Sequence, residues 1–408
     1  MKTVLDSRAA WITASAALAI MTIAYGAPLV VVVAMKQIAA ELQTSRAAPA
    51  GASSLSYVGA AFGGIVAGWL AGRLGIRPIV IFGSTMVALG LTLSSWGGMA
   101  ELYLGHGIFM GLFGTSCMFS PLLTYVSLWF ERRRGSAVAL IASGQTVAGA
   151  IWPPLLQFGI DEVGWRHTML WFGGFVLVSG ATLTMIFLHP APIAPSATAA
   201  GAANGQRRDS TLGLPPNLLM VLLMIAVYSC CVPMAMPMNH VVAYCGDLGF
   251  ASQYGAAMLS VLLGVAFLAR QFWGWLSDRI GGFHTLLFSS LVQATALAGF
   301  LVTKDMAALF VVSAAFGFGL SGLLPAYVIV IRDCFSAHEA NWRIPTVMFA
   351  GLLGMASGGW GAGMLYDQFG GYLPAFSTGI AFNFLNLGVL LFLVSRHTRL
   401  IRQPQTSI

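Results

Sequence analysis

Charged side chains are scarce in this sequence. Only 8% of its 408 residues are Asp, Glu, Lys or Arg, whereas 58% are hydrophobic and the mean hydropathy is +0.82. Soluble domains carry about 25% charged residues, so this chain cannot cover a water-facing surface. Its apolar stretches reach about 20 residues, the length of a membrane-spanning helix. A membrane β-barrel is excluded, because it would show alternating segments of about ten residues.

Cysteine is scarce as well, and the residue patterns of enzymes are missing. The five cysteines lie in or beside apolar runs without the spacing of metal ligands, so we interpret them as small buried hydrophobes. We find no phosphate-binding loop, no pairing of a nucleophile with a base, and no large soluble segment. These absences argue against a membrane-embedded enzyme or receptor and exclude an ATP-driven pump. We expect no cofactor and no metal.

Twelve apolar segments that could cross a membrane follow one another along the chain. The N-terminal stretch MKTVLDSRAAW contains two cations, but no small-residue cleavage site follows it. We therefore interpret the first segment as a membrane helix rather than a removable signal. The predicted spans are 11–36, 52–72, 78–98, 102–130, 136–160, 166–188, 216–243, 253–276, 284–303, 306–331, 344–365 and 373–395.

The spans form two halves. The only long connection, 189–215, is rich in Ala, Pro, Gly and Ser, which is typical of a flexible linker, and it separates residues 1–188 from residues 216–408. The halves repeat with an offset of 206 residues, because GWLAGRLG at 68–75 matches GWLSDRIG at 274–281. We predict an all-α membrane protein with twelve transmembrane helices in two pseudo-symmetric six-helix halves. Transporters built in this way bind their substrate between the repeats at mid-membrane.

The distribution of positive charge predicts the orientation. With both termini and the linker on one side, that side holds fifteen of the twenty Lys and Arg residues and the opposite side holds four. The richer side is therefore cytoplasmic, and we expect a multi-pass protein of the cell (inner) membrane with both termini inside. The net charge of +7 follows from this topology and indicates no nucleic-acid partner.

The remaining cation, Arg270, lies inside the apolar span 253–276. All thirteen Asp and Glu residues fall at span ends or in connections, so no acid within a span can pair with it. A central arginine costs about 2.5–3.5 kcal/mol on insertion scales, and it keeps its charge. We therefore hypothesise that the anion is the cargo.

Two structural roles for Arg270 also stay open. The side chain could extend to the cytoplasmic edge of the membrane, but the eight residues of helix to Asp278 cover about 12 Å, which is farther than an arginine reaches. It could also bind a backbone carbonyl of a neighbouring helix.

The repeated motif resembles a known transporter class. The segment GWLSDRIGG is similar to the loop motif that follows the second and eighth helices of the major facilitator superfamily. The first copy departs from that pattern, because Gly72 replaces the usual aspartate. The resemblance implies a role in gating and helix-end packing for Gly68, Arg73, Gly75, Gly274, Asp278, Arg279 and Gly281.

Within that superfamily, the run Ala269-Arg270-Gln271, followed by Gly274, resembles the eighth helix of monocarboxylate transporters. The arginine of that helix pairs with the substrate carboxylate. Animal members also carry a proton-coupling aspartate one turn earlier, where this chain has Ala266. Oxalate–formate exchangers are similar too, but they add a second cation in the eleventh helix, and this chain has none there.

The resemblance implies alternating-access transport of small monocarboxylates of the lactate or pyruvate kind, by a monomer and by proton symport. An organic-anion exchanger without proton coupling is the alternative.

Polar residues of the seventh and tenth spans are further candidates for the site. Pro233 and Pro237 predict an interrupted seventh helix, and Asn239 and His240 follow them. His240 is a candidate for substrate binding and for carrying the proton, although a packing histidine is an equal alternative. In the tenth span, Tyr327 could donate to a carboxylate or bond to a neighbouring helix.

Five weaker candidates for substrate binding complete the prediction: Tyr25, Cys117, Tyr125, Ser143 and Gln145. Outside the site, Trp165 at the start of the sixth span is predicted to lie in the aromatic belt at the membrane interface.

Overall fold

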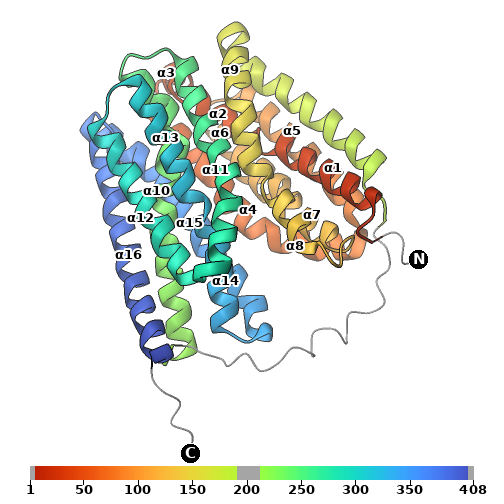
Figure 1. The fold of residues 1–408 in the computed structure, drawn as a ribbon. Helices are drawn as coiled ribbons and strands as arrows, with labels where there is room; N and C mark the ends of the chain where they lie inside the picture. Colours follow the sequence, from red (N-terminus) through yellow and green to blue (C-terminus); the bar gives the residue numbers. More distant parts are fainter. Residues whose placement is uncertain (1–4, 191–211, 403–408) are drawn as a thin grey trace, which may run out of the picture. The chain divides into compact units, whose positions relative to one another are not determined.

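The computed structural model describes residues 5–190 and 212–402, which leaves most of the predicted linker, 191–211, outside the described residues. Throughout these two ranges the regular secondary structure is helical (Figure 1). The chain divides into two compact units. The first comprises Met1–Asn204 with Asn239–Ser260, and the second comprises Gly205–Met238 with Val261–Ile408. The proposed boundary at the linker thus differs from the contact units by one segment, Asn239–Ser260, which packs with the first unit.

The first unit is built around the long helix α9, against which α1, α2 and α5 pack (Figure 1). A π-helix, η1, and a short 3₁₀-helix, η2, interrupt the fourth predicted span. The elements are α1 (Arg8–Ala24), α2 (Leu29–Val33), α3 (Met35–Glu41), α4 (Ala47–Leu74), α5 (Ile76–Trp96), α6 (Met99–Leu104), η1 (Gly105–Gly114), η2 (Thr115–Cys117), α7 (Phe119–Ser127), α8 (Arg134–Ala142) and α9 (Gly144–Phe187), with the end of α10 and the start of α11.

The second unit is built around α12, which packs against α13, α14 and α16. Its elements are the greater parts of α10 (Pro216–Asp247) and α11 (Ser252–Ile280), followed by α12 (Gly282–Val302), α13 (Met306–Ser321), α14 (Leu323–Cys334), α15 (Ala337–Phe369) and α16 (Leu373–Arg402).

The predicted all-helical membrane fold is confirmed, and each of the twelve predicted segments coincides with helical residues. Within the described ranges, nine helices are long and apolar enough to cross a membrane, or ten if the bent helix α4 counts as one span. Two predicted spans merge in α9, where Gly164 has a non-helical backbone with φ +79° and marks their boundary.

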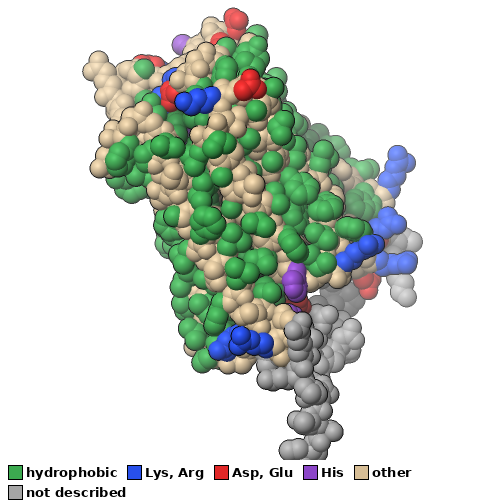
Figure 2. Space-filling model, turned by 60° about the vertical axis from the view of Figure 1, so that its left-hand side comes forward, with side chains coloured by type: hydrophobic (Ala, Val, Ile, Leu, Met, Phe, Trp, Pro, Cys, Tyr) green, Lys and Arg blue, Asp and Glu red, His purple; other side chains and the backbone are tan. Residues whose placement is uncertain are grey.

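Hydrophobic side chains cover most of the visible face, and charged side chains lie towards its edges (Figure 2).

The sequence repeat reappears in the local backbone geometry. Gly75 and Gly281 both have φ of +81°, and each follows the long helix that carries its copy of the motif. An L-residue side chain is strained at this φ, so glycine is needed at both junctions. In each copy the motif arginine lies over a tryptophan one turn earlier, at 4.0 Å for Arg73 on Trp69 and 4.1 Å for Arg279 on Trp275.

Glycines let the helices of the first unit approach closely. A Cβ on Gly59 would lie 2.2 Å from the carbonyl oxygen of Gly107, and a Cβ on Gly63 would lie 2.0 Å from that of Leu112. Both contacts join α4 to the π-helix η1. Small residues at such contacts are how membrane helices gain packing energy without a hydrophobic driving force.

Candidate functional site

Arg270 lies well inside α11, ten residues before its last residue, Ile280. At 1.5 Å per residue this is about 15 Å of helix. The side chain is half-buried, while Ala266 and Ala269 on the preceding turn have exposed fractions of 0% and 5%. Asp278, the nearest acid along the helix, is exposed. The guanidinium therefore lies deep along an apolar helix, next to a turn whose alanines are buried.

The helix that carries Arg270 packs against a break in the tenth span. That span is two helices, α13 and α14, separated at Gly322. The indole N–H of Trp273 donates to the Phe318 carbonyl at 2.7 Å, and a Cβ on Gly322 would lie 2.6 Å from the Trp273 ring. Broken backbone at membrane depth is tolerated where protein groups or a cavity satisfy it, and Trp273 supplies such a group.

Tyr327 begins a chain of hydrogen bonds in the second unit. Its hydroxyl donates to the Asn386 side-chain oxygen at 2.8 Å, and the Asn386 amide donates to Ser290 Oγ at 2.7 Å. Ser290 donates to Asn383 at 3.0 Å, and Asn383 donates to Gln293 at 2.8 Å. All five side chains are fully buried. In this structure Tyr327 thus makes the interhelical bond that was one of its two predicted roles.

The hydrogen-bond chain joins four helices, because Gln293 also donates to the Cys230 carbonyl of α10 at 3.4 Å. Sequence reasoning missed its members on α12 and α16. The available signal was a pair of polar residues spaced by three in each of two apolar spans, Ser290 with Gln293 and Asn383 with Asn386. That spacing places both side chains on one helix face.

Tyr25 lies at a second helix break, in the first span. The residues from Tyr25 to Pro28 form turns between α1 and α2. The Thr22 carbonyl before the break accepts a hydrogen bond from the indole N–H of Trp152 at 2.7 Å. The Tyr25 ring is half-buried and meets Phe119 edge-on, with 6.3 Å between ring centres. The two units therefore share a device, an interrupted span whose freed carbonyl is bound by a tryptophan.

The predicted interruption of the seventh span by two prolines is wrong. The helix α10 runs without a break through Pro233 and Pro237. Each proline lacks a backbone N–H and so removes one hydrogen bond of the helix. A membrane helix that is packed among others can tolerate this loss. Asn239 and His240 follow on the same helix with exposed fractions of 3% and 0%, and both belong to the first unit.

The weaker candidates for substrate binding mostly make contacts within the first unit. Tyr125 donates to the His189 carbonyl at 2.6 Å, and Ser143 donates to the Ala139 carbonyl at 2.8 Å. Cys117 is buried against Ala67 and Ile79. Gln145 is half-buried, and its amide makes no hydrogen bond to the described residues. Arg270 and Tyr327 lie in the second unit and the other substrate-binding candidates in the first.

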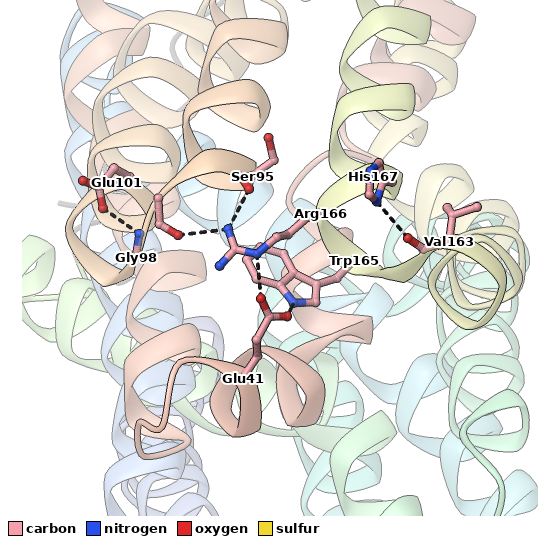
Figure 3. A network of polar contacts seen from close by, with 9 residues as sticks. Glu41, Ser95, Gly98, Glu101, Val163, Trp165, Arg166 and His167 are labelled. Atoms are coloured by element: carbon pink, nitrogen blue, oxygen red, sulfur yellow. Dashed lines mark hydrogen bonds and ion pairs between the residues drawn. The ribbon is translucent and has the colours of Figure 1, made fainter.

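Polar contacts also organise one end of the first unit (Figure 3). Arg166 Nε donates to Glu41 at 2.7 Å, and Arg166 Nη1 donates to the Ser95 carbonyl at 2.6 Å. Trp165 is buried and its indole N–H donates to Glu41. This charged hydrogen bond joins α9 to the end of α3. The place of Trp165 in the aromatic belt at the membrane interface stays a prediction.

The sequence model of the Major Facilitator Superfamily matches residues 11–306. The chain belongs to this superfamily. Among curated proteins, it is 28% identical over 339 residues to monocarboxylate transporter 13 of Rattus norvegicus, covering 81% of this chain and 76% of that protein. It is 27% identical over 392 residues to monocarboxylate transporter 11 of Mus musculus, covering 93% and 79%.

A solved structure agrees on the fold. A mutant of the nucleoside transporter NupG superposes with a TM-score of 0.73 at 12% identity, over 95% of this chain and all of that one. This facilitator-superfamily protein is accordingly a membrane transporter of a small-molecule substrate and not an enzyme.

Proposed function

We propose that this facilitator-superfamily transporter carries small monocarboxylates of the lactate or pyruvate kind, and that Arg270 binds their carboxylate. The observation that carries the proposal is a half-buried guanidinium about 15 Å inside an apolar helix. The names of the relatives, monocarboxylate transporters 11 and 13, support the same substrate class. Arginine is suited to this task because its planar fork matches the two oxygens of a carboxylate.

The proposed mechanism is alternating access with proton symport. A bound carboxylate neutralises the guanidinium, which lowers the cost of enclosing the charge in an occluded state of low dielectric constant. A proton must accompany the anion if transport is to be electrically neutral. Since Ala266 stands where animal members carry an aspartate, His240 is the proposed proton site. The proposal includes a monomer in the inner membrane with both termini in the cytoplasm.

Counterflow of labelled lactate in proteoliposomes tests the role of Arg270. Arg270→Gln is expected to lose counterflow while keeping the elution profile and melting temperature of a folded protein. Arg270→Lys should retain only a small part, because an ammonium keeps the charge without the fork. Arg399→Gln, at the exposed end of α16, is the matched control and should transport normally. Normal counterflow by folded Arg270→Gln would overturn the proposal.

An anion exchanger without proton coupling is the second candidate function. It is favoured by Ala266, whose exposed fraction is 0%, because a proton-carrying acid is missing from this closely packed turn. A pH-sensitive dye inside the vesicles separates the two. Symport predicts proton uptake driven by lactate, which His240→Gln should abolish without stopping counterflow. Normal counterflow by a wild-type protein that takes up no protons when a lactate gradient is imposed on substrate-free vesicles would establish exchange.

A further inference from the structure

The carboxylate of Asp247, at the end of α10, is bound by two cations of the first unit. Arg46 contacts both of its oxygens, with Nη1 on Oδ2 and Nη2 on Oδ1, and the Lys36 ammonium donates to Oδ1 at 3.1 Å. The side chains of Arg46 and Asp247 are 13% and 24% exposed, and that of Lys36 is 43% exposed. Two positive charges face one negative charge, so the cluster keeps a net charge of about +1.

This geometry is that of a carboxylate-binding site, which is called the receptor below. A guanidinium that meets both oxygens is the strong, directional way in which proteins bind carboxylates, and an ammonium adds a point charge. The group that fills the receptor is an aliphatic carboxylate on a single methylene, which chemically resembles a small monocarboxylate. The two cations thus already bind one carboxylate, that of Asp247.

The segments that carry the two cations are anchored independently of Asp247. Lys36 is the second residue of the seven-residue helix α3 (Met35–Glu41), and Glu41 ends it. Glu41 is fixed to α9 by Trp165 and Arg166 (Figure 3). Arg46 is the residue that caps the start of the 28-residue helix α4. Both cations therefore lie on anchored elements of the connection between the first two spans, which the charge distribution predicts to be on the outer side.

On α10, Gly246 leaves room for the side chain of Lys36 beside Asp247. A Cβ on Gly246 would lie 3.0 Å from the Lys36 ammonium and 3.3 Å from its Cδ. The absent side chain lets the lysine lie against the last turn of α10. Asp247 itself ends that helix, and Gly249, with φ of +87°, follows two residues later. The carboxylate thus sits at a helix end next to a turn, and the cations sit on anchored elements.

We propose that Lys36 and Arg46 form an outer binding subsite for the carboxylate of the cargo, and that Asp247 occupies it as an internal competitor. The inference rests on the proposed function in one respect, that the cargo is a carboxylate. When Asp247 withdraws, an incoming monocarboxylate replaces it, and when the cargo moves on, Asp247 returns. In this cycle Lys36 and Arg46 always have a carboxylate partner, either Asp247 or the cargo.

Acetate, which reproduces the Asp247 side chain, is the probe for this subsite. The experiment uses the full-length purified protein with Arg270→Gln as background, so the proposed mid-membrane site cannot contribute. Sodium acetate replaces sodium chloride at constant ionic strength, and the melting temperature is measured. With Asp247→Asn added, acetate should raise it by about 1–2 °C. With Lys36→Gln and Arg46→Gln added as well, that rise should disappear.

The result that overturns the subsite is an Asp247→Asn protein that acetate does not stabilise, or stabilises equally without the two cations. Failure of the mid-membrane proposal leaves this experiment intact, because Arg270 is absent from every variant.

If Asp247→Asn does not fold, influx into cells decides with Asp247 in place. Lys36→Gln weakens the binding of Asp247 and of the cargo alike, so the change in KM is not decisive, but loss of one cation should weaken the salt dependence of KM for influx. An unchanged salt dependence would overturn the subsite.

Discussion

The indole N–H of Trp273 donates to the carbonyl of Phe318 at 2.7 Å, and through this bond the helix that carries Arg270 closes a break in the tenth span. The bond fixes α11 against a point where the backbone of its neighbour is not a regular helix. The same device recurs in the first unit, where Trp152 binds the Thr22 carbonyl beside Tyr25. In each unit a predicted substrate-binding residue lies within one turn of the tryptophan or of the break that it closes.

Trp273→Phe is predicted to destabilise the protein, because it keeps a ring but leaves the Phe318 carbonyl without its donor. Interhelical hydrogen bonds in membranes contribute about 0.6 kcal/mol on average and up to about 1.7 kcal/mol. We expect a lower melting temperature and a larger KM for substrate, since α11 loses its anchor. Trp171→Phe is the control, because this side chain is 75% exposed on α9. Equal melting temperatures of the two variants would show that the bond has no energetic role.

Mutations in the hydrogen-bond chain that starts at Tyr327 can distinguish a structural role of its hydroxyl from a role in substrate binding. Tyr327→Phe removes one bond, worth about 0.6 kcal/mol, and Asn386→Leu removes two. A structural chain predicts lower melting temperatures, largest for Asn386→Leu, with KM unchanged. Tyr254→Phe, on a 38% exposed tyrosine, is the control. A raised KM for Tyr327→Phe without loss of stability would instead assign its hydroxyl to the substrate.

The contacts of Glu41 predict a pH dependence of stability. Hydrogen bonding from Arg166, followed by Trp165, stabilises the carboxylate and lowers the pKa of Glu41 from its usual value. The unfolded chain therefore binds this proton more readily than the folded one. The contribution of Glu41 is complete above the unfolded pKa of about 4.3 and is lost as the pH falls through the lower, folded pKa.

Melting curves between pH 7 and pH 4 check this dependence. Glu41→Gln should melt below the wild type at pH 7, and the difference should shrink towards pH 4. Glu162→Gln, on an exposed acid of α9, should melt like the wild type throughout. A difference for Glu41→Gln that stays constant with pH would contradict the assigned cause.

The two repeated glycines, Gly75 and Gly281, predict that alanine at either position destabilises the protein to a similar extent. At φ of +81°, with ψ of 170° and 162°, Gly75 and Gly281 adopt a backbone that is essentially restricted to glycine. Alanine at either position should cost about 1–3 kcal/mol, seen as a lower melting temperature. Gly68→Ala and Gly274→Ala are matched controls, because these glycines are helical and a Cβ there would meet nothing within 4 Å. They should be neutral or slightly stabilising. Similar losses at all four positions would point to packing instead of backbone strain.

The sequence predicted those features of the fold that depend on a single helix. Span positions follow from apolar length, and the internal repeat follows from GWLAGRLG and GWLSDRIG, so both reappear in the structure. The break at Tyr25 and the continuity of α10 through Pro233 depend on what a neighbouring helix offers, such as the indole of Trp152. The polar pairs spaced by three, such as Asn383 with Asn386, mark one face of a helix but do not name the partner on another helix, and for this reason the hydrogen-bond chain was not recognised.

The two broken spans have a consequence for the exchange of backbone amides with solvent. In a regular membrane helix each amide hydrogen is held by the carbonyl four residues earlier, and exchange waits for the helix to open. Around the first break the amides of Gly26 and Ala27 reach back only three residues, to Ile23 and Ala24. Deuterium uptake should therefore begin within the first and tenth spans at these two turns. An exchange map of the protein should show early labelling at these two turns, inside helices that are otherwise protected.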